Sequence, residues 1–223
     1  AGRFYVPFGL NLQTDTHGTL LQLSNDRNFG FERDWYAGFW GSINPHLNYD
    51  AYYLLGSGYP IEFGGQNGMT GMRLSLSNQY RNDYGLEGGA AVLYGERLSE
   101  DDVVDTLRVG IDARYTVAAP AGSVSLTVEL SGGQDESDAV FTQLYELGFL
   151  SQDRRWGSSA QYRRFRQDGD GDDTSLIGEV AWYFRNDIGG AFLHSLRFNV
   201  ERQLERQSGS DTTIMTLQYY FYW

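Results

Sequence analysis

Apolar and polar residues alternate with a period of two along most of the chain. The clearest example runs from Thr212 to Trp223, where Met215, Leu217, Tyr219, Phe221 and Trp223 alternate with Thr216, Gln218, Tyr220 and Tyr222. Successive side chains of a β-strand point to opposite faces of a sheet, whereas an amphipathic helix needs apolar residues three or four positions apart. The pattern therefore predicts an all-β, antiparallel protein.

Read in the same way, the whole chain predicts twelve strands. They cover residues 2–11, 34–43, 47–57, 69–80, 83–95, 103–117, 122–132, 138–150, 155–167, 174–185, 191–203 and 212–223. A single all-β domain can absorb 223 residues, so we predict one domain, residues 1–223. The longest irregular stretch is Leu12 to Arg33, and we expect it to cover one end of the sheet or to fold inward.

The predicted connections alternate in length along the chain. Short turns are expected at 44–46, 81–82, 118–121, 151–154 and 186–190, and longer loops at 12–33, 58–68, 96–102, 133–137, 168–173 and 204–211. In transmembrane up-and-down barrels the turns at one end are short and the loops at the other end are long. The alternation therefore favours a membrane barrel over a soluble β-sandwich.

The two faces of each predicted strand differ in polarity. Leu107, Val109 and Ile111 alternate with Arg108 and Asp112. A sandwich would bury the apolar face, whereas a barrel in lipid turns it outward and lines its lumen with the charged face.

The strand at 138–150 does not follow this rule, because Gln143 and Glu146 fall on opposite faces. Its inward side is left undetermined by the pattern, and a β-bulge is one explanation.

Two stretches resemble a known class of proteins. The final strand, with its terminal aromatic residue, resembles the last strand of bacterial outer-membrane β-barrel proteins, where it acts as the assembly signal; Gly2 to Leu10 (Gly-Arg-Phe-x-x-Pro-Phe-Gly-Leu) is similar to a porin strand that lies well inside a longer chain. The resemblance implies an antiparallel up-and-down transmembrane β-barrel in the outer membrane of a Gram-negative bacterium, its C-terminus facing the periplasm. It would have about twelve strands here, and more if the chain is the C-terminal part of a larger porin. The partners implied are outer-membrane lipid, lipopolysaccharide and the barrel-assembly machinery, and a homo-oligomer is compatible with this class.

Composition narrows the function further. The net charge is −12, and all 17 basic residues are arginines, a balance that argues against nucleic acid as a partner. There is no cysteine, so the chain carries no attachment signature for c-type haem, and we expect no cofactor. No apolar run reaches the ~18 residues of a membrane helix, but only alternate residues of a barrel strand face lipid.

The inward positions predict a charged lumen. Taken by parity, they are Arg3, Arg73, Arg108, Arg114, Arg163, Arg185 and Arg197 against Asp50, Glu87, Asp112, Glu129, Glu179 and Glu201. One interpretation is a water-filled pore whose charges orient small solutes. The alternative is that these groups pair with one another and fill a narrow lumen.

The remaining acids gather in the longer connections, for example at Asp135, and Asp168, Asp170 and Asp172 alternate in one of them. Oxygen ligands at this spacing indicate weak Ca²⁺ or Mg²⁺ binding, with a solvated acidic loop as the alternative.

The three histidines do not form a catalytic arrangement. His17 lies in the long loop, His46 in a turn, and His194 on the face opposite its neighbour Ser195. We therefore predict that the protein is not an enzyme but a channel for passive diffusion of small hydrophilic solutes or ions. The alternatives are a narrow scaffold barrel that encloses or anchors a partner protein, and an outer-membrane barrel hydrolase that depends on His17.

Overall fold

A single sheet of twelve antiparallel strands, in chain order, makes up the fold. The computed structural model describes residues 1–10, 28–58, 61, 67–76, 84–99, 102–168, 171–185, 194–205 and 211–221. The strands are β1 (Gly2–Tyr5), β2 (Arg33–Asn44), β3 (Leu47–Leu54), β4 (Gly68–Leu76), β5 (Gly85–Ser99), β6 (Asp102–Ala119), β7 (Gly122–Asp135), β8 (Asp138–Ser151), β9 (Trp156–Gln167), β10 (Gly171–Arg185), β11 (His194–Glu205) and β12 (Asp211–Phe221). The predicted all-β, antiparallel, up-and-down arrangement of twelve strands is confirmed.

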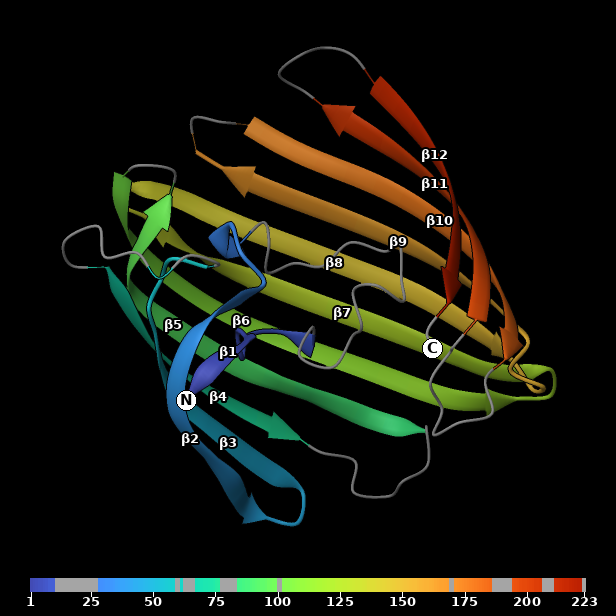
Figure 1. Cartoon of the computed structure of the whole chain (residues 1–223), viewed down its shortest axis with the longest axis horizontal. Coiled ribbons are helices and arrows are strands. Elements are labelled where there is room, and N and C mark those ends of the chain that lie inside the picture. Colours follow the sequence, from blue (N-terminus) through green and yellow to red (C-terminus); the bar gives the residue numbers. More distant parts are fainter. Residues whose placement is uncertain are drawn as a thin grey trace.

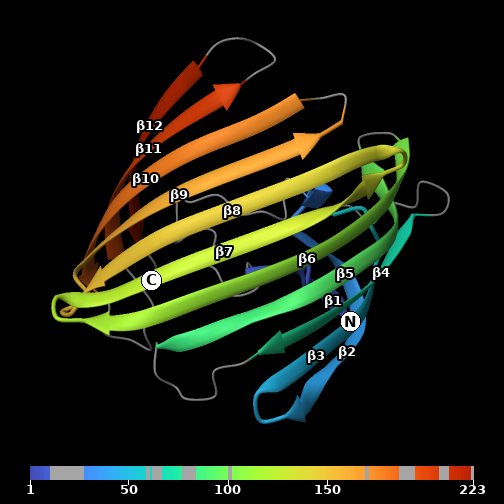
Figure 2. The same cartoon turned by 180° about the vertical axis from the view of Figure 1, so that it is seen from behind.

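The sheet curls into a deep trough, with β1 to β3 along one side and β10 to β12 along the other (Figures 1 and 2). Each strand pairs with its neighbour in sequence. Among the described residues β12 pairs only with β11 and β1 only with β2, so the sheet has two edges and is not closed into a barrel. Within that described part, no helix is long and apolar enough to cross a membrane.

The central strands are longer than the sequence pattern predicts. β5, β6, β7 and β8 contain 15, 18, 14 and 14 residues. The loop predicted at 133–137 is a tight turn at Glu136–Ser137, because Gly132 and Gly133 continue the strand and pair with β6 and β8. The predicted loop at 96–102 is likewise reduced to the two positions between Ser99 and Asp102. The predicted loop at 168–173 is shortened as well, because β10 begins at Gly171. The expected alternation of long and short connections is therefore wrong at these three connections.

The first strand is shorter than predicted, because Pro7 ends it. Val6 still donates its N–H to the carbonyl oxygen of Glu32 at 3.0 Å, but proline has no N–H with which to continue the ladder. The Phe8 N–H then donates to the Val6 carbonyl at 2.7 Å, which closes a three-residue γ-turn. Val6 to Gly9 are buried, so the chain leaves the sheet edge and enters the concave side instead of running extended to Asn11.

The two faces of the sheet have opposite polarity. Large apolar side chains are exposed on the convex face: Val92, Val109, Ile111, Leu126, Tyr145, Leu147, Leu176, Val180 and Phe198. Polar and charged side chains are buried on the concave face: Arg73, Arg108, Asp112, Thr127, Glu129, Ser131, Gln161, Arg163, Ser175, Glu179, Arg197 and Asn199. This is the inverse of a water-soluble sheet packed on an apolar core.

The face of β8 that the sequence left undetermined is settled by the register. β8 pairs with β7 and β9 without a bulge over its central residues. Val140, Thr142 and Leu144 are buried, and Phe141, Tyr145 and Leu147 are exposed. Glu146 therefore belongs to the concave face and Gln143 to the convex face.

An apolar cluster lies on the concave side, and we call it the inner aromatic cluster. Its members are Val6, Phe8, Phe29, Phe31, Tyr36, Tyr52, Leu54, Met69, Ala91 and Leu93. The rings of Phe8 and Phe29 meet edge to face with centroids 5.3 Å apart. A Cβ at Gly110 of β6 would lie 2.6 Å from the Phe8 ring, so a glycine is needed there. Of the predicted 12–33 loop, the described residues from Asn28 onward thus fold inward.

We predict that truncation of Phe8 destabilises the fold far more than truncation of Phe4. Phe8 is 2% exposed and Phe4 is 53% exposed. Phe8→Ala should lower the free energy of unfolding by about 3 kcal/mol, because it leaves a cavity among packed rings. Phe4→Ala is the matched control and should change it by less than about 1 kcal/mol. Equilibrium denaturation of both variants measures the difference, and equal losses would show that Phe8 is not packed inside.

Candidate functional site

A buried ion pair joins strands β4 and β6 across the concave face. Arg73 Nη1 and Nη2 donate to Asp112 Oδ2 and Oδ1 at 2.5 and 2.7 Å. Both side chains are almost fully buried, so removing one would leave the other as an uncompensated charge away from water. The intervening strand β5 makes room with Gly89, where a Cβ would lie 2.7 Å from Arg73 Nη2.

A second buried cluster holds two arginines on one carboxylate. Asp135 Oδ2 accepts from Arg108 at 2.8 Å and from Arg97 at 3.1 Å, and Thr106 donates to Oδ1 at 2.9 Å. Arg108 also donates to the carbonyl oxygens of Leu107 and Gln134, at 2.9 Å each. The sequence placed Asp135 in a solvated loop, which is wrong because β7 continues through this residue and buries it.

Further pairs extend the charged face across β9, β10 and β11. Arg197 Nη1 donates to Glu179 Oε1 at 3.2 Å, and its guanidinium carbon lies 5.5 Å from the centre of the Tyr183 ring. Arg163 donates to the Ser175 hydroxyl at 3.3 Å, which in turn donates to Glu201 Oε1 at 3.1 Å. These bonds link neighbouring strands through side chains as well as through the backbone.

Most residues predicted to line a pore occupy the buried, concave face. Eight of them are at least nine-tenths buried: Arg73, Arg108, Asp112, Glu129, Arg163, Glu179, Arg197 and Glu201. Asp50, Glu87 and Arg114 are half-buried, and Arg3 is exposed on β1. The side chain of Arg185 lies outside the described part of the structure. Whether these groups line an open pore stays a prediction.

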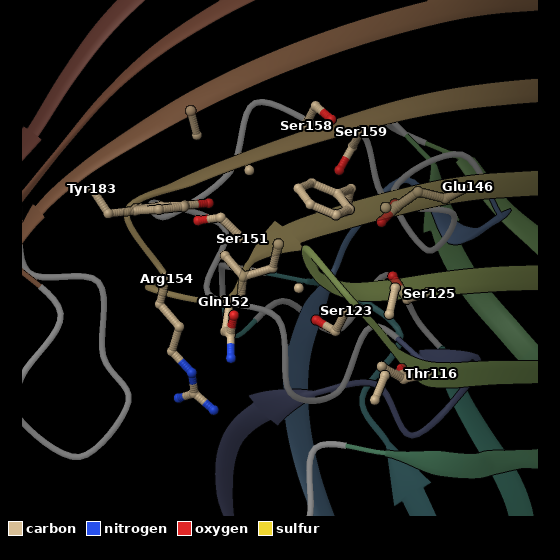
Figure 3. Close-up of a pocket in the computed structure, with 18 of the residues that line it drawn as sticks. Thr116, Ser123, Ser125, Glu146, Ser151, Gln152, Arg154, Ser158, Ser159 and Tyr183 are labelled. Atoms are coloured by element: carbon tan, nitrogen blue, oxygen red, sulfur yellow. The ribbon is translucent and has the colours of Figure 1, made fainter.

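The concave face also holds a polar cavity of about 720 Å³. It lies between the ends of β6 to β10, next to the β6–β7 and β8–β9 turns, and Figure 3 shows its polar side chains. Its charged members are Arg114, Glu146, Arg154 and Glu179. Its hydroxyl members are Tyr84, Thr116, Ser123, Ser125, Ser151, Ser158, Ser159 and Tyr183. Glycine and alanine fill much of the remaining wall, which keeps the cavity open.

Sequence reasoning missed Glu146 as a member of this site. The carboxylate accepts a hydrogen bond from Gln161 Nε2 at 3.1 Å. The alternation was hidden because β8 carries apolar residues on both faces: Val140 and Leu144 are buried on the concave face, and Phe141, Tyr145 and Leu147 are exposed on the convex face. Thr142, on the concave face, donates to Asn28 Oδ1 of the inward-folded segment at 2.8 Å. Only the register against β7 and β9 assigns Glu146 to the cavity.

The turn between β8 and β9 forms one rim of the cavity. Asp153 Oδ1 accepts from the Ser151 hydroxyl at 2.6 Å and from the Arg155 N–H at 3.1 Å. The Ser151 hydrogen bond and the backbone bond lower the pKa of the exposed Asp153 carboxyl. Arg154, held with a positive φ of 53°, contributes its side chain to the cavity wall.

The predicted metal residues are only partly described. Asp172 Oδ2 accepts from Arg164 at 2.5 Å, and Asp168 Oδ1 lies 4.0 Å from Arg166. Asp170 lies outside the described residues. Among those that are described, no group of three or more histidine, aspartate or glutamate side chains is placed to hold a metal ion.

Of the three histidines, His17 also lies outside the described residues. His194 packs against Phe221 with ring centres 5.8 Å apart, and His46 lies in the turn after β2.

Aromatic side chains gather on the convex face at the cavity end of the sheet. Trp156 and Trp182 oppose each other across β9 and β10, and both are exposed. Phe149 lies 4.9 Å from Trp156, and Phe184 lies 6.4 Å from Tyr219, between ring centres.

The fold and the site define a class: an antiparallel sheet protein with a charged concave face and an apolar convex face. No model of a protein family matches the chain, and no curated protein matches it either.

We predict that the Arg73–Asp112 pair contributes far more to the free energy of unfolding than the Arg114–Glu87 pair. In the second pair Nη1 and Oε1 are 3.1 Å apart, but the side chains are 34% and 40% exposed. Arg73→Ala should lower the free energy of unfolding by about 3 kcal/mol or more, because it leaves a buried carboxylate unpaired. Arg114→Ala should cost less than about 1 kcal/mol, because water screens that pair. Double-mutant cycles with Asp112→Ala and Glu87→Ala test both values, and equal coupling energies would contradict the burial of the first pair.

Proposed function

We propose that the chain is an outer-membrane β-barrel that acts as a narrow channel for passive diffusion of small hydrophilic solutes or ions. The observation that carries this proposal is the inverted polarity of the sheet: buried ion pairs on the concave face and exposed apolar side chains on the convex face. Soluble monomers rarely expose a continuous apolar surface of this kind. Lipid would cover it, with the C-terminus and the aromatic residues near Trp156 and Trp182 at the periplasmic side.

The proposal requires the sheet to close. The unpaired edges of β1 and β12 would expose backbone N–H and C=O groups to hydrocarbon, where each unsatisfied group costs several kcal/mol. The curvature of the trough supports closure, because both outer parts of the sheet, β1 to β3 and β10 to β12, bend toward its concave face (Figure 1). The barrel-assembly machinery, recognising the C-terminal strand, is the partner that such closure implies.

The channel would work by steric filtering and by the charges of its wall. The arginines and carboxylates are fixed by one another, so they present a rigid polar surface to a passing solute. The inner aromatic cluster narrows the lumen at the Asp135 end of the sheet, and the polar cavity widens it at the other end. Lipopolysaccharide and outer-membrane phospholipid are the expected surroundings.

A second candidate is a scaffold barrel that encloses or anchors a partner. The observation in its favour is that the buried charges are already paired, and that ten apolar residues of the inner aromatic cluster occupy the concave side. In this case the lumen would conduct no solute, and conductance separates the two.

We predict that an arginine on the convex face prevents membrane insertion, whereas one in the polar cavity does not. Ile111 is 57% exposed at the middle of β6. Ile111→Arg should destabilise the folded protein in the membrane by about 2–4 kcal/mol, because it places an arginine at the bilayer midplane. Ser125→Arg is the control, since its side chain would enter a polar cavity. Refolding into lipid vesicles, read as a heat-modifiable band on a gel, should fail only for Ile111→Arg. Equal insertion of both variants would overturn the membrane proposal.

We predict that the cavity charges set ion preference in opposite directions. In planar bilayers across a salt gradient, Arg114→Gln should increase cation preference, because it removes a positive charge from the wall. Glu146→Gln should decrease it for the converse reason. Asp138→Asn, an exposed change at the far end of β8, is the control and should leave the reversal potential unchanged. Absence of conductance in a correctly inserted wild-type protein would reject the channel and leave the scaffold.

A further inference from the structure

We propose that the polar cavity is a binding site for a neutral polyhydroxylated solute of mono- to disaccharide size. This inference deepens the proposed channel by naming its substrate class, and it rests on that proposal only for the route by which the solute arrives. The cavity suits such a solute in the charge balance of its wall, the availability of its hydroxyl groups and its size.

The charges of the wall cancel, and side chains next to the cavity engage them. Arg114 pairs with Glu87 at 3.1 Å, Glu179 with Arg197 at 3.2 Å, and Glu146 accepts from Gln161 at 3.1 Å. With Arg154, the cavity contains two positive and two negative groups. An ionic solute would find no net countercharge, so the lining favours neither an anion nor a cation.

The hydroxyl groups, in contrast, remain available. Thr116, Ser123, Ser125 and Ser159 line the cavity from β6, β7 and β9, and none forms a side-chain hydrogen bond with the residues that the structure describes. Each hydroxyl both donates and accepts, as do the hydroxyls of a sugar. Their convergence on one space supplies several hydrogen bonds for a solute that carries many hydroxyl groups (Figure 3).

Gly148 keeps the space between two of these hydroxyls open. A Cβ at this position would lie 2.6 Å from Ser125 Oγ and 3.7 Å from Ser159 Oγ. Tyr84 and Tyr183 add aromatic surface to the wall, which suits the apolar faces of a sugar ring. The volume of about 720 Å³ falls in the range of small-molecule sites, roughly 300–1,000 Å³.

The test measures sugar binding to the full chain folded in detergent micelles, by calorimetry, with glucose and maltose as probes. Glycine, as a zwitterion, and gluconate, as an anion, are the comparison solutes. We expect the neutral sugars to bind and the charged solutes to bind at least about tenfold more weakly. Equal binding of all four solutes, or no binding of either sugar, would overturn the inference.

Paired variants locate the site. The double variant Ser125→Ala/Ser159→Ala should weaken sugar binding about tenfold through the loss of two hydrogen bonds. The control Thr212→Ala/Thr213→Ala removes two exposed hydroxyls of β12, outside the cavity, and should leave sugar binding unchanged. Gly148→Val should abolish binding by filling the space. Unchanged binding in Ser125→Ala/Ser159→Ala would show that the cavity is not the site.

Conductance in planar bilayers separates this inference from the proposed channel. Sugar binding in micelles without any conductance would support the site and reject the channel. Stable conductance with no sugar binding, and no decrease of current when maltose is added, would support the channel and reject the site. Both results together are the expected outcome, with Ser125→Ala/Ser159→Ala conducting but less sensitive to maltose.

Discussion

Each charged group buried on the concave face needs a partner, and this requirement organises the structure. Moving a single charge out of water costs several kcal/mol even after the protein relaxes around it. The sheet meets that cost by placing arginines and carboxylates opposite each other on adjacent or next-adjacent strands, as in Arg73–Asp112 and Arg197–Glu179. A register shift of one residue in any of these strands would move its charges to the apolar face. The pairs therefore stabilise the register of the strands and also compensate the buried charges.

The convex and concave faces are two consequences of one alternating pattern. Because the apolar set faces outward, it cannot supply a core, and the interior must be filled by other means. The ion pairs fill part of it, and the inner aromatic cluster fills another part with residues from the segments beside Pro7 and Phe29. The polar cavity lies where the wall residues are serine, glycine and alanine, too small to fill the space. The stability of this protein and the shape of its cavity therefore depend on the same inward-facing side chains.

Local sequence rules succeeded where a strand has one polar and one apolar face. Period-two alternation located all twelve strands and placed Arg108, Asp112 and Glu129 on the concave face. It failed at Asp135, where an acidic residue beside glycines was read as a loop but ends a strand in a buried ion cluster. It also failed after Tyr5, where the alternation continues but Pro7 interrupts the ladder. At Asp135 the deciding partners, Arg97 and Arg108, are distant in sequence. After Tyr5 the cause is local, because Pro7 has no N–H to donate.

The sequence by itself determined the strand count, the antiparallel order and the polarity of the two faces, because these follow from alternation and from short connections between neighbouring strands. Tertiary structure alone decided the inward side of β8, the membership of Glu146 in the cavity, and the pairing of Arg97 and Arg108 with one carboxylate. It also brought Phe8 against Gly110 and Phe29. The physical reason is that these contacts join positions far apart in the chain, and their geometry is fixed by register and curvature, which no single strand encodes.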